Sequence, residues 1–285
     1  MKSVSRHLVL RLTCPDTTGI VAAVATAIAD NGGSIEHADQ HTDTSGTFFQ
    51  RIEFTYPGDE PDSELLAKFA DLGKRFSMKI DLQDMNRVMR VGLLASKQPH
   101  CLFDMLIRWK SGELPIDIPV VISNHADHAE FCRNLGVEFH HLPVTADTRQ
   151  QQETEMVRVL NAAHVDLVVM ARYMQILSPT MLNAFPLRVI NIHHSFLPAF
   201  IGGNPYRQAF DRGVKLVGAT AHYATEILDE GPILEQEVVR VSHRDTPESM
   251  ARKGRDLETT VLARAVRDHV EHRVMVLGNR TVVFN

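Results

Sequence analysis

The segment VMRVGLLAS, residues 88–96, decides how the larger part of the chain folds. It is a nearly continuous apolar strand, and IPVVISN (118–124), VDLVVMARY (165–173) and LRVINIHH (187–194) repeat this character. Helical segments such as CLFDMLIRWK (101–110) separate these strands. Apolar strands that alternate with helices form a parallel sheet that is covered by helices on both faces.

The end of the chain extends this α/β pattern. Two further apolar segments, 216–225 and 232–241, are typical of later strands in the same sheet. A long helix is predicted over 245–274, and a hairpin over 274–284. We therefore predict that residues 87–285 form one α/β domain with a doubly wound, mainly parallel, Rossmann-like sheet.

The first 86 residues follow a different pattern. Segments that alternate between apolar and polar residues predict four strands, and two segments with helical periodicity lie between them. The predicted strands are 7–13, 34–43, 47–57 and 78–84, and the predicted helices are 20–30 and 61–76. The order β-α-β-β-α-β is that of a ferredoxin-like α+β fold. We therefore predict a separate domain over residues 1–86.

Composition limits the classes of function. The 285 residues are 44% hydrophobic and 23% charged with a formal net charge of −5, a balance typical of globular proteins that predicts no nucleic-acid partner. Cys14, Cys101 and Cys132 match no zinc or disulfide spacing, and their odd number favours a reducing compartment. Because no signal peptide and no apolar run of about 20 residues is present, we expect a cytoplasmic protein without a membrane partner.

The candidate site lies in VINIHH, where Asn191 and His193 are two residues apart on a predicted strand. Residues i and i+2 of a strand share a face, so both side chains point to one spot. Ligands of open parallel sheets bind at the carboxyl ends of the strands. Three loops are expected to meet there, at residues 171–181, 195–210 and 221–233.

Asn191, His193 and Asp229 together suit attack on an acyl carbon. Asn191 can donate a hydrogen bond to a developing oxyanion, and His193 can exchange a proton near neutral pH. Asp229 can stabilise the imidazolium and accept a hydrogen bond from water. A Ser-His-Asp triad with Ser195 as nucleophile is the less favoured alternative, because no G-x-S-x-G turn surrounds Ser195.

The histidines also admit plainer interpretations. A buried His is often a satisfied core residue, and His194, on the opposite strand face from His193, is expected to be structural. A metal site of His193, His194 and His222 is a further alternative. Adjacent strand residues point to opposite faces and no H-E-x-x-H motif occurs, so we predict no metal site.

Two motifs carry a resemblance to the folate-dependent formyltransferase family. They are NIHHSFLPAFIGGNPYRQA (191–209) and GATAHYATEILDEGPILEQ (218–236), and Asn191, His193 and Asp229 fall on that family's catalytic Asn-x-His and Leu-Asp-x-Gly-Pro positions. ARYMQILSP, which starts at Ala171, is similar to its folate-pocket segment. The resemblance covers residues 87–285 and implies that folate is contacted by Tyr173, Met174, Ile176, Leu177, Thr225, Ile227 and Gly231.

LTCPDTTGIVAAVATAIADNGGSI (12–35) resembles an ACT domain. An ACT domain joined directly to a transferase-type domain is the arrangement of the formyltetrahydrofolate deformylases. The resemblance implies a homo-oligomer, a dimer or tetramer, and a small amino-acid effector bound at Asp16, Thr18, Gly19 and Ile20. The alternative is that CPDTTG is only a tight turn before a helix.

The implied activity is hydrolysis of 10-formyltetrahydrofolate, as substrate and without a permanently bound cofactor, to formate and tetrahydrofolate. The formate would supply purine (IMP) biosynthesis and balance the one-carbon pool. The segment LLASKQPHCLFDML (93–106) favours hydrolysis, because it lacks the glycines that cradle a phosphate in the related amine formyltransferases, and Pro99 removes one N–H donor. Lys97 could still meet a phosphate.

Two other functions stay open at this point. One is formyl transfer to an amine such as glycinamide ribonucleotide, or to transfer RNA, against which the absence of a basic tract counts. The other is a non-catalytic folate or amino-acid sensor, which would not require Asn191, His193 and Asp229 together.

Overall fold

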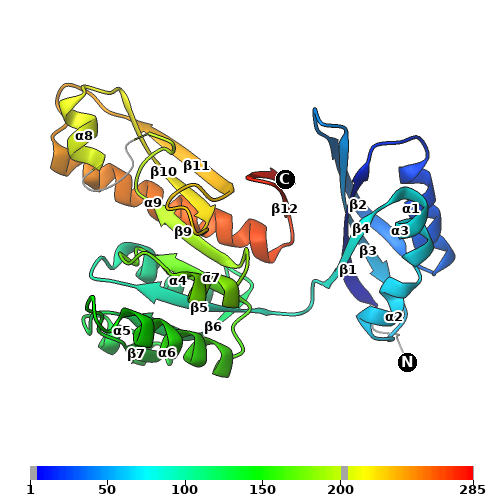
Figure 1. The fold of residues 1–285 in the computed structure, drawn as a ribbon, viewed down its shortest axis with the longest axis horizontal. Helices are drawn as coiled ribbons and strands as arrows, with labels where there is room; N and C mark the ends of the chain where they lie inside the picture. Colours follow the sequence, from blue (N-terminus) through cyan, green and yellow to red (C-terminus); the bar gives the residue numbers. More distant parts are fainter. Residues whose placement is uncertain (1–4, 200–204, 285) are drawn as a thin grey trace. The chain divides into compact units, whose positions relative to one another are not determined.

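The computed structural model describes residues 5–199 and 205–284. The chain divides into two compact units, which are coloured along the sequence in Figure 1. The smaller unit contains the described residues up to Val88, together with Glu271–Met275 and the segment from Val282. The larger unit contains Met89–Val270 and Val276–Thr281. The sequence-based division into 1–86 and 87–285 stays a prediction.

The smaller unit has the expected β-α-β-β-α-β order with one additional helix. Its elements are β1 (Arg6–Pro15), α1 (Ile20–Asp30), β2 (Ser34–Thr42), β3 (Thr47–Tyr56), α2 (Asp62–Ala67), α3 (Ala70–Phe76) and β4 (Lys79–Asp84). The strands form an antiparallel sheet in the order β2-β3-β1-β4. The predicted ferredoxin-like fold is confirmed.

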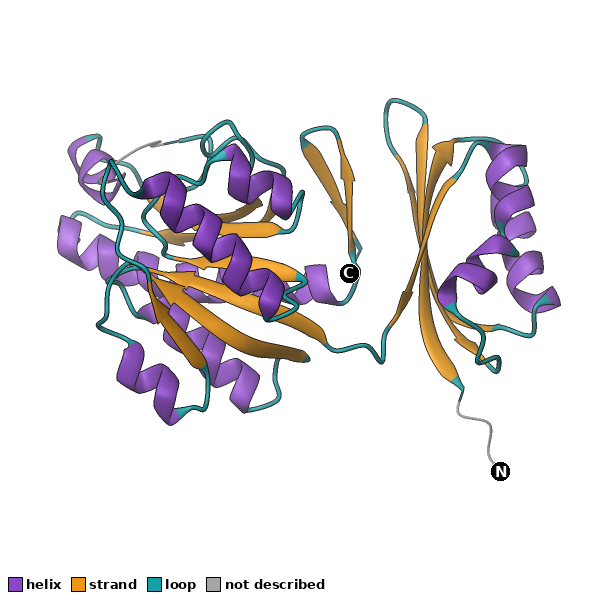
Figure 2. Cartoon of the chain, turned by 60° about the horizontal axis from the view of Figure 1, so that its bottom comes forward, coloured by secondary structure: helices purple, strands orange, loops and turns teal. Residues whose placement is uncertain are grey.

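The helices of this unit cover one face of its sheet (Figure 2). Alternate residues of β1 and β3 bury their side chains beneath them, and the register pairs Leu8 with Phe54 and Leu10 with Ile52. The helix predicted over 61–76 is two helices. The amides of Lys68 and Phe69 each bond a carbonyl three residues back, a tight turn that ends α2 before α3 begins.

The larger unit is an α/β layer structure. Its elements are β5 (Met89–Ala95), α4 (His100–Lys110), β6 (Ile116–Ser123), α5 (Ala129–Asn134), β7 (Glu138–His141), α6 (Arg149–Ala162), β8 (Leu167–Ala171), α7 (Pro179–Ala184), β9 (Val189–His193), α8 (Pro205–Asp211), β10 (Leu216–Tyr223), β11 (Ile233–Arg240) and α9 (Pro247–Val270). The strand order is β11-β10-β9-β8-β5-β6-β7. The tail forms the hairpin β12 (Val274–Leu277) and β13 (Arg280–Val283), as predicted.

The mainly parallel sheet is confirmed, with one refinement. β7, β6, β5, β8 and β9 are parallel, whereas β10 is antiparallel to both β9 and β11. β5 and β8 are buried almost throughout, which explains their continuous apolar character. Gly92 in β5 allows α6 to approach, because a Cβ there would lie 2.5 Å from a methyl carbon of Leu160.

Two segments that were predicted to be loops contain short helices. α7 begins after Ser178, whose side chain accepts a hydrogen bond from the amide of Thr180, with Pro179 at the first helical position. α8 occupies the end of the segment 195–210, of which residues 200–204 lie outside the described residues. Both helices have only six or seven residues, too short for an apolar period to show. In the described part, no helix is long and apolar enough to cross a membrane.

Candidate active site

The carboxyl end of β9 carries Asn191 and His193, which are two residues apart along the strand. β9 lies between β8, its parallel neighbour, and β10, its antiparallel neighbour. The register with β10 places His222 directly opposite Asn191. The polar side chains of the site therefore come from two adjacent strands.

Asp229, from the loop after β10, contacts His193. Oδ1 of Asp229 lies 3.2 Å from Nδ1 of His193, and the two side chains are only 7% and 6% exposed. Nε2 of His193 is buried and has no hydrogen-bond partner among the residues that the structure describes. A carboxylate that holds Nδ1 fixes the orientation of the ring, and Nε2 is then the atom available to a substrate.

A second pair fixes Asn191. Nδ1 of His222 lies 2.9 Å from the carbonyl oxygen of Tyr223 and donates to it. This tautomer leaves Nε2 of His222 to accept a hydrogen bond of 3.2 Å from Nδ2 of Asn191. One N–H of the amide group is thereby used for orientation, and the other can donate to an oxyanion.

The loop that carries Asp229 is held tightly. Asp229 has a φ of 58°, in the left-handed region that Asp tolerates better than most residues. At Gly231 a Cβ would lie 1.7 Å from the carbonyl oxygen of Tyr223, so only glycine fits. Burial would raise the pKa of the Asp229 carboxyl, but its neighbours, the hydrogen bond with His193 first among them, outweigh burial and hold the pKa well below its usual value. Asp229 is therefore ionised at neutral pH.

A cavity of about 540 Å³ opens over Asn191, His193 and Asp229. Small-molecule sites commonly enclose roughly 300–1,000 Å³. Ile227 and Gly231 are not among the lining residues, and Gly231 packs against the main chain instead. Five of the seven residues expected to contact folate do line the cavity: Tyr173, Met174, Ile176, Leu177 and Thr225.

Hydrogen bonds to neighbouring elements hold the segment 173–178 along this cavity in place. The Tyr173 hydroxyl lies 3.1 Å from Nε2 of Gln152, and Oγ of Ser96 accepts a 3.0 Å hydrogen bond from the Met174 amide. The buried carboxylate of Glu153 accepts a hydrogen bond from the amide of Ser178 and one from its hydroxyl. These bonds leave the side chains of Met174 and Ile176, each more than half exposed, available for a flat apolar ligand.

The residues expected to bind an effector form one turn of the smaller unit. Gly19 has a φ of 95° just before α1, a conformation that favours glycine, and a Cβ there would meet open space. Ile20 is buried in the core, whereas Asp16, Thr18 and Gly19 are exposed. The turn is therefore both a helix start and an accessible surface.

Ser195 does not form a triad. Its hydroxyl donates a 2.8 Å hydrogen bond to the carbonyl of Ala199, and its side chain belongs to the buried set rather than to the cavity lining. The ring of His194 meets that of His193 edge-on, at 5.1 Å between centroids. Burial, with the charges of Arg172 and His193, lowers the pKa of His194 to about 4, so it stays neutral.

Within the described residues, the side chains with metal-ligand spacing are His100, Cys101 and Glu258, whose ligand atoms lie within 4.8 Å of one another. His193, His194 and His222 are not in this group.

Comparisons with known proteins identify the family of the chain. The formyl transferase family matches residues 89–266, and the ACT domain family matches residues 8–68. A formyltetrahydrofolate deformylase from Synechocystis is 51% identical over 96% of this chain and 97% of its own length. The chain belongs to the formyltetrahydrofolate deformylase family.

Solved structures separate two kinds of relative. The crystal structure of a formyltetrahydrofolate deformylase from Pseudomonas syringae is 47% identical, covers 98% of this chain and 95% of its own, and has a TM-score of 0.94. A glycinamide ribonucleotide transformylase from Symbiobacterium toebii is 36% identical, covers 72% of this chain and 98% of its own, and has a TM-score of 0.68. The deformylase family thus shares one of its units with enzymes named for an amine acceptor.

Sequence reasoning missed two contributors to this deformylase-family site. His222 was considered only as a metal ligand, and Ser96 was not singled out. The signal for His222 was its position in AHY directly before the loop that carries Asp229. The antiparallel register that places it opposite Asn191 is not visible in the sequence.

Proposed function

We propose that this chain hydrolyses 10-formyltetrahydrofolate to formate and tetrahydrofolate. The observation that carries the proposal is the buried pair of His193 and Asp229, at 3.2 Å, beside an Asn191 amide that His222 holds in place. This arrangement supplies an oxyanion donor, a proton carrier and an ionised carboxylate around one point of the cavity.

The reaction begins with water in contact with Asp229. The contacts of Asp229 with His193 and His222 use Oδ1, so Oδ2 is the oxygen that accepts a hydrogen bond from the water. As the water oxygen bonds to the formyl carbon, its proton passes to the Asp229–His193 pair. The second N–H of Asn191 and Nε2–H of protonated His193 stabilise the oxyanion.

Collapse of this tetrahedral intermediate breaks the bond between the formyl carbon and N10. His193 delivers a proton to N10 as the bond breaks, and the formyl carbon leaves as formic acid, which loses its remaining proton to solvent and becomes formate. Asp229 stabilises the imidazolium before this transfer, which agrees with the direction of its pKa shift. Proton and charge balance without any cofactor.

The folate would lie along the apolar lining, against Met174, Ile176 and Leu228, with its ring system over the anchored segment 173–178. We assign the substrate contacts to Tyr173, Met174, Ile176, Leu177 and Thr225.

The remaining assignments rest on the ACT match and on the composition. The turn Asp16, Thr18, Gly19 and Ile20 would receive an amino-acid effector, and the chain would act as a homo-oligomer. The three cysteines are free and buried, which suits a reducing compartment such as the cytoplasm. The formate would serve purine synthesis.

The test is an assay of the purified chain with 10-formyltetrahydrofolate and no amine. Equal amounts of formate and tetrahydrofolate support the proposal, and Asp229→Asn should abolish them. Product that requires an added amine would show that the chain is a transferase.

A further inference from the structure

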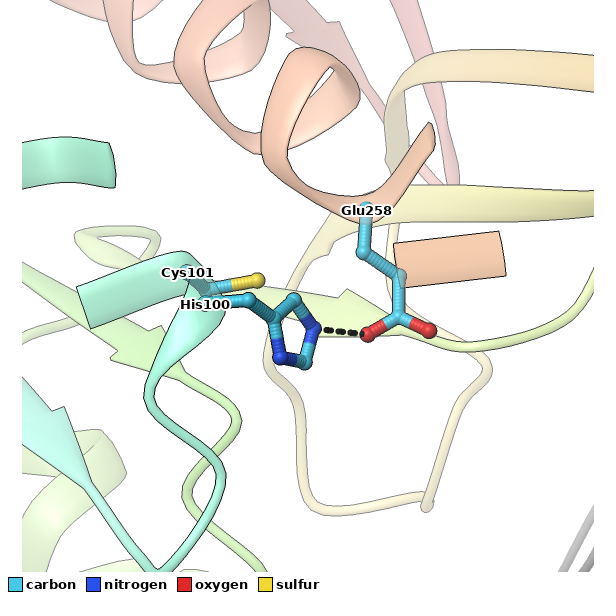
Figure 3. A group of neighbouring side chains, drawn as sticks. All are labelled: His100, Cys101 and Glu258. Atoms are coloured by element: carbon cyan, nitrogen blue, oxygen red, sulfur yellow. Dashed lines mark hydrogen bonds and ion pairs between the residues drawn. The ribbon is translucent and has the colours of Figure 1, made fainter. Parts of the chain in front are cut away.

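The cavity has a second cluster of charged side chains that the proposed mechanism does not use. Nε2 of His100, the first residue of α4, donates a 2.7 Å hydrogen bond to Oε2 of Glu258 on α9. Figure 3 shows this bond and the imidazole of His100 turned toward the carboxylate. The hydroxyl of Tyr206, on α8, donates a 2.8 Å hydrogen bond to Oε1. Nε of Arg172 lies 3.2 Å from Oε2 as an ion pair.

This network is buried, and the bonds of its members converge on the carboxylate; Nδ1 of His100 and Nε of Arg172 have no hydrogen-bond partner among the described residues. The side chain of Glu258 is 1% exposed, and partners contact both of its oxygens. Burial would raise the pKa of Glu258, but the bond from His100 and the charge of Arg172 outweigh it, so the carboxyl pKa lies below its usual value. Removing any partner would leave a buried charge with less compensation, which is strongly unfavourable. The network therefore holds its members in place.

α9 is shaped to admit the network. At Gly254 a Cβ would lie 1.8 Å from the hydroxyl oxygen of Tyr206. A glycine inside a helix makes the helix less stable than an alanine does. Gly254 is explained by packing, because the ring of Tyr206 occupies the place of a Cβ. The ring of Tyr206 also contacts His194, at 6.3 Å between centroids, and His194 contacts His193. Ring contacts thus connect Tyr206 of the network, through His194, to His193 of the candidate active site.

A metal ion does not suit this cluster, although His100, Cys101 and Glu258 have ligand spacing (Figure 3). Arg172 already places a positive charge next to Oε2 of Glu258. Burial and the neighbouring Glu258 raise the pKa of the Cys101 thiol well above its usual value, whereas metals bind the thiolate.

The network lies on a polar side of the cavity. If the folate occupies the apolar lining, the side left for a nucleophile includes Gln98, His100, Arg172, Tyr206, Arg255 and Glu258. A water molecule needs less room between these side chains than an amine attached to a larger molecule. His100 belongs to the segment 93–106, which lacks the glycines of a phosphate cradle. The same segment therefore offers no backbone anion site and places the His100 side chain in the cavity.

We propose that the network of His100, Arg172, Tyr206 and Glu258 closes the acceptor side of the cavity to amines, so that water is the nucleophile. The proposal rests on the proposed hydrolysis. In an opened cavity an amine nitrogen would bond to the formyl carbon in place of water. The bond to N10 would break, N10 would take up a proton through His193, and the amine would lose one.

The experiment measures how the formyl group divides between water and amine. The unaltered protein, Tyr206→Ala and His100→Ala are incubated with 10-formyltetrahydrofolate and either glycinamide or glycinamide ribonucleotide, which adds a phosphate that exposed Arg255 can meet. Formylated amine and formate are then quantified. We expect formate alone from the unaltered protein and at least a tenfold higher ratio of formylated amine to formate from the variants. Tyr206→Phe, which keeps the ring, should resemble the unaltered protein.

Phe210→Ala is the matched control, because Phe210 is an exposed aromatic residue on the same short helix and lies outside the cavity lining. If Tyr206→Ala fails to fold, His100→Ala opens the same side. An unchanged ratio in a variant that still releases formate overturns the proposal, and so does formylated amine made by the unaltered protein. Absence of formate from the unaltered protein without amine contradicts the proposed function instead, so the two failures are distinct.

Discussion

Two carboxylates in one cavity, Asp229 and Glu258, have similar charges but different bonding. Both are almost fully buried as side chains, and both have a carboxyl pKa below the usual value. Partners contact both oxygens of Glu258, whereas the contacts of Asp229 with His193 and His222 use only Oδ1. A perturbed pKa therefore does not distinguish a reactive carboxylate from a structural one.

The neighbours of the two carboxylates differ in what their polar atoms face. His193, which Asp229 holds, has a buried Nε2 without a partner among the described residues. Unsatisfied buried atoms are rare in folded proteins and often mark a place where a ligand binds. The second cluster also has such atoms, Nδ1 of His100 and Nε of Arg172, but its Tyr206 hydroxyl and its Arg172 guanidinium are both directed at the carboxylate of Glu258. We interpret the first cluster as the reacting one and the second as the one that shapes the cavity.

The largest expected effect is on stability at Glu258. Glu258→Ala leaves His100 and Arg172 facing a buried gap, and such loss of one partner costs about 3–5 kcal/mol of the free energy of unfolding. Urea unfolding followed by the fluorescence of Trp109, which is the single tryptophan and lies in α4 of the same unit, measures it. Asp229→Asn is the matched variant and should lose less stability. A larger loss at Asp229 would reverse the comparison.

The next effect is on catalysis at His193. His193→Ala removes an oxyanion donor and the proton carrier, so we expect kcat to fall by at least about 10²–10³, or about 3–4 kcal/mol in the barrier. Circular dichroism checks that the variant is folded. Ser195→Ala is the control and should keep most of its activity, because its hydroxyl bonds Ala199. An equal loss of kcat in Ser195→Ala would favour the alternative in which Ser195 is the nucleophile of a triad.

A pH effect follows from His194. Its pKa is about 4 in the folded chain and about 6.5 when unfolded. Between these values the unfolded state binds the proton and the folded state does not, so stability falls as the pH drops from about 6.5 to 4. The contribution is at most about 3 kcal/mol. Because burial also lowers the pKa of His272 to about 4, the check is the difference between the unaltered protein and His194→Gln, which should show a shallower fall.

The smallest effect concerns the fit of Tyr206. Gly254→Ala improves helix propensity by about 1 kcal/mol, but its Cβ would overlap the Tyr206 hydroxyl at a typical overpacking cost of about 1–3 kcal/mol. We expect a net loss, measured by the urea midpoint. In a Tyr206→Ala background the same substitution should be stabilising. Stabilisation in both backgrounds would mean that Tyr206 does not pack on Gly254.

The sequence predicted the parts of this account that depend on local pattern. Strand and helix periodicity gave both sheets, and the spacing of Asn191 and His193 placed them on one strand face. It could not provide the antiparallel register of β10, which brings His222 to Asn191, because direction along a sheet is set by the connections between distant strands. Nor could it reveal that His100 and Glu258, 158 residues apart, meet in the cavity.

The most direct test of the central claim is formate release from 10-formyltetrahydrofolate in the complete absence of an amine, compared between the unaltered chain and Asp229→Asn. We predict that the unaltered chain yields one formate for each tetrahydrofolate, and that the Asp229 variant, still folded by Trp109 fluorescence, yields almost none. Equal formate release by both proteins would contradict the assignment of Asp229 as the carboxylate that activates water.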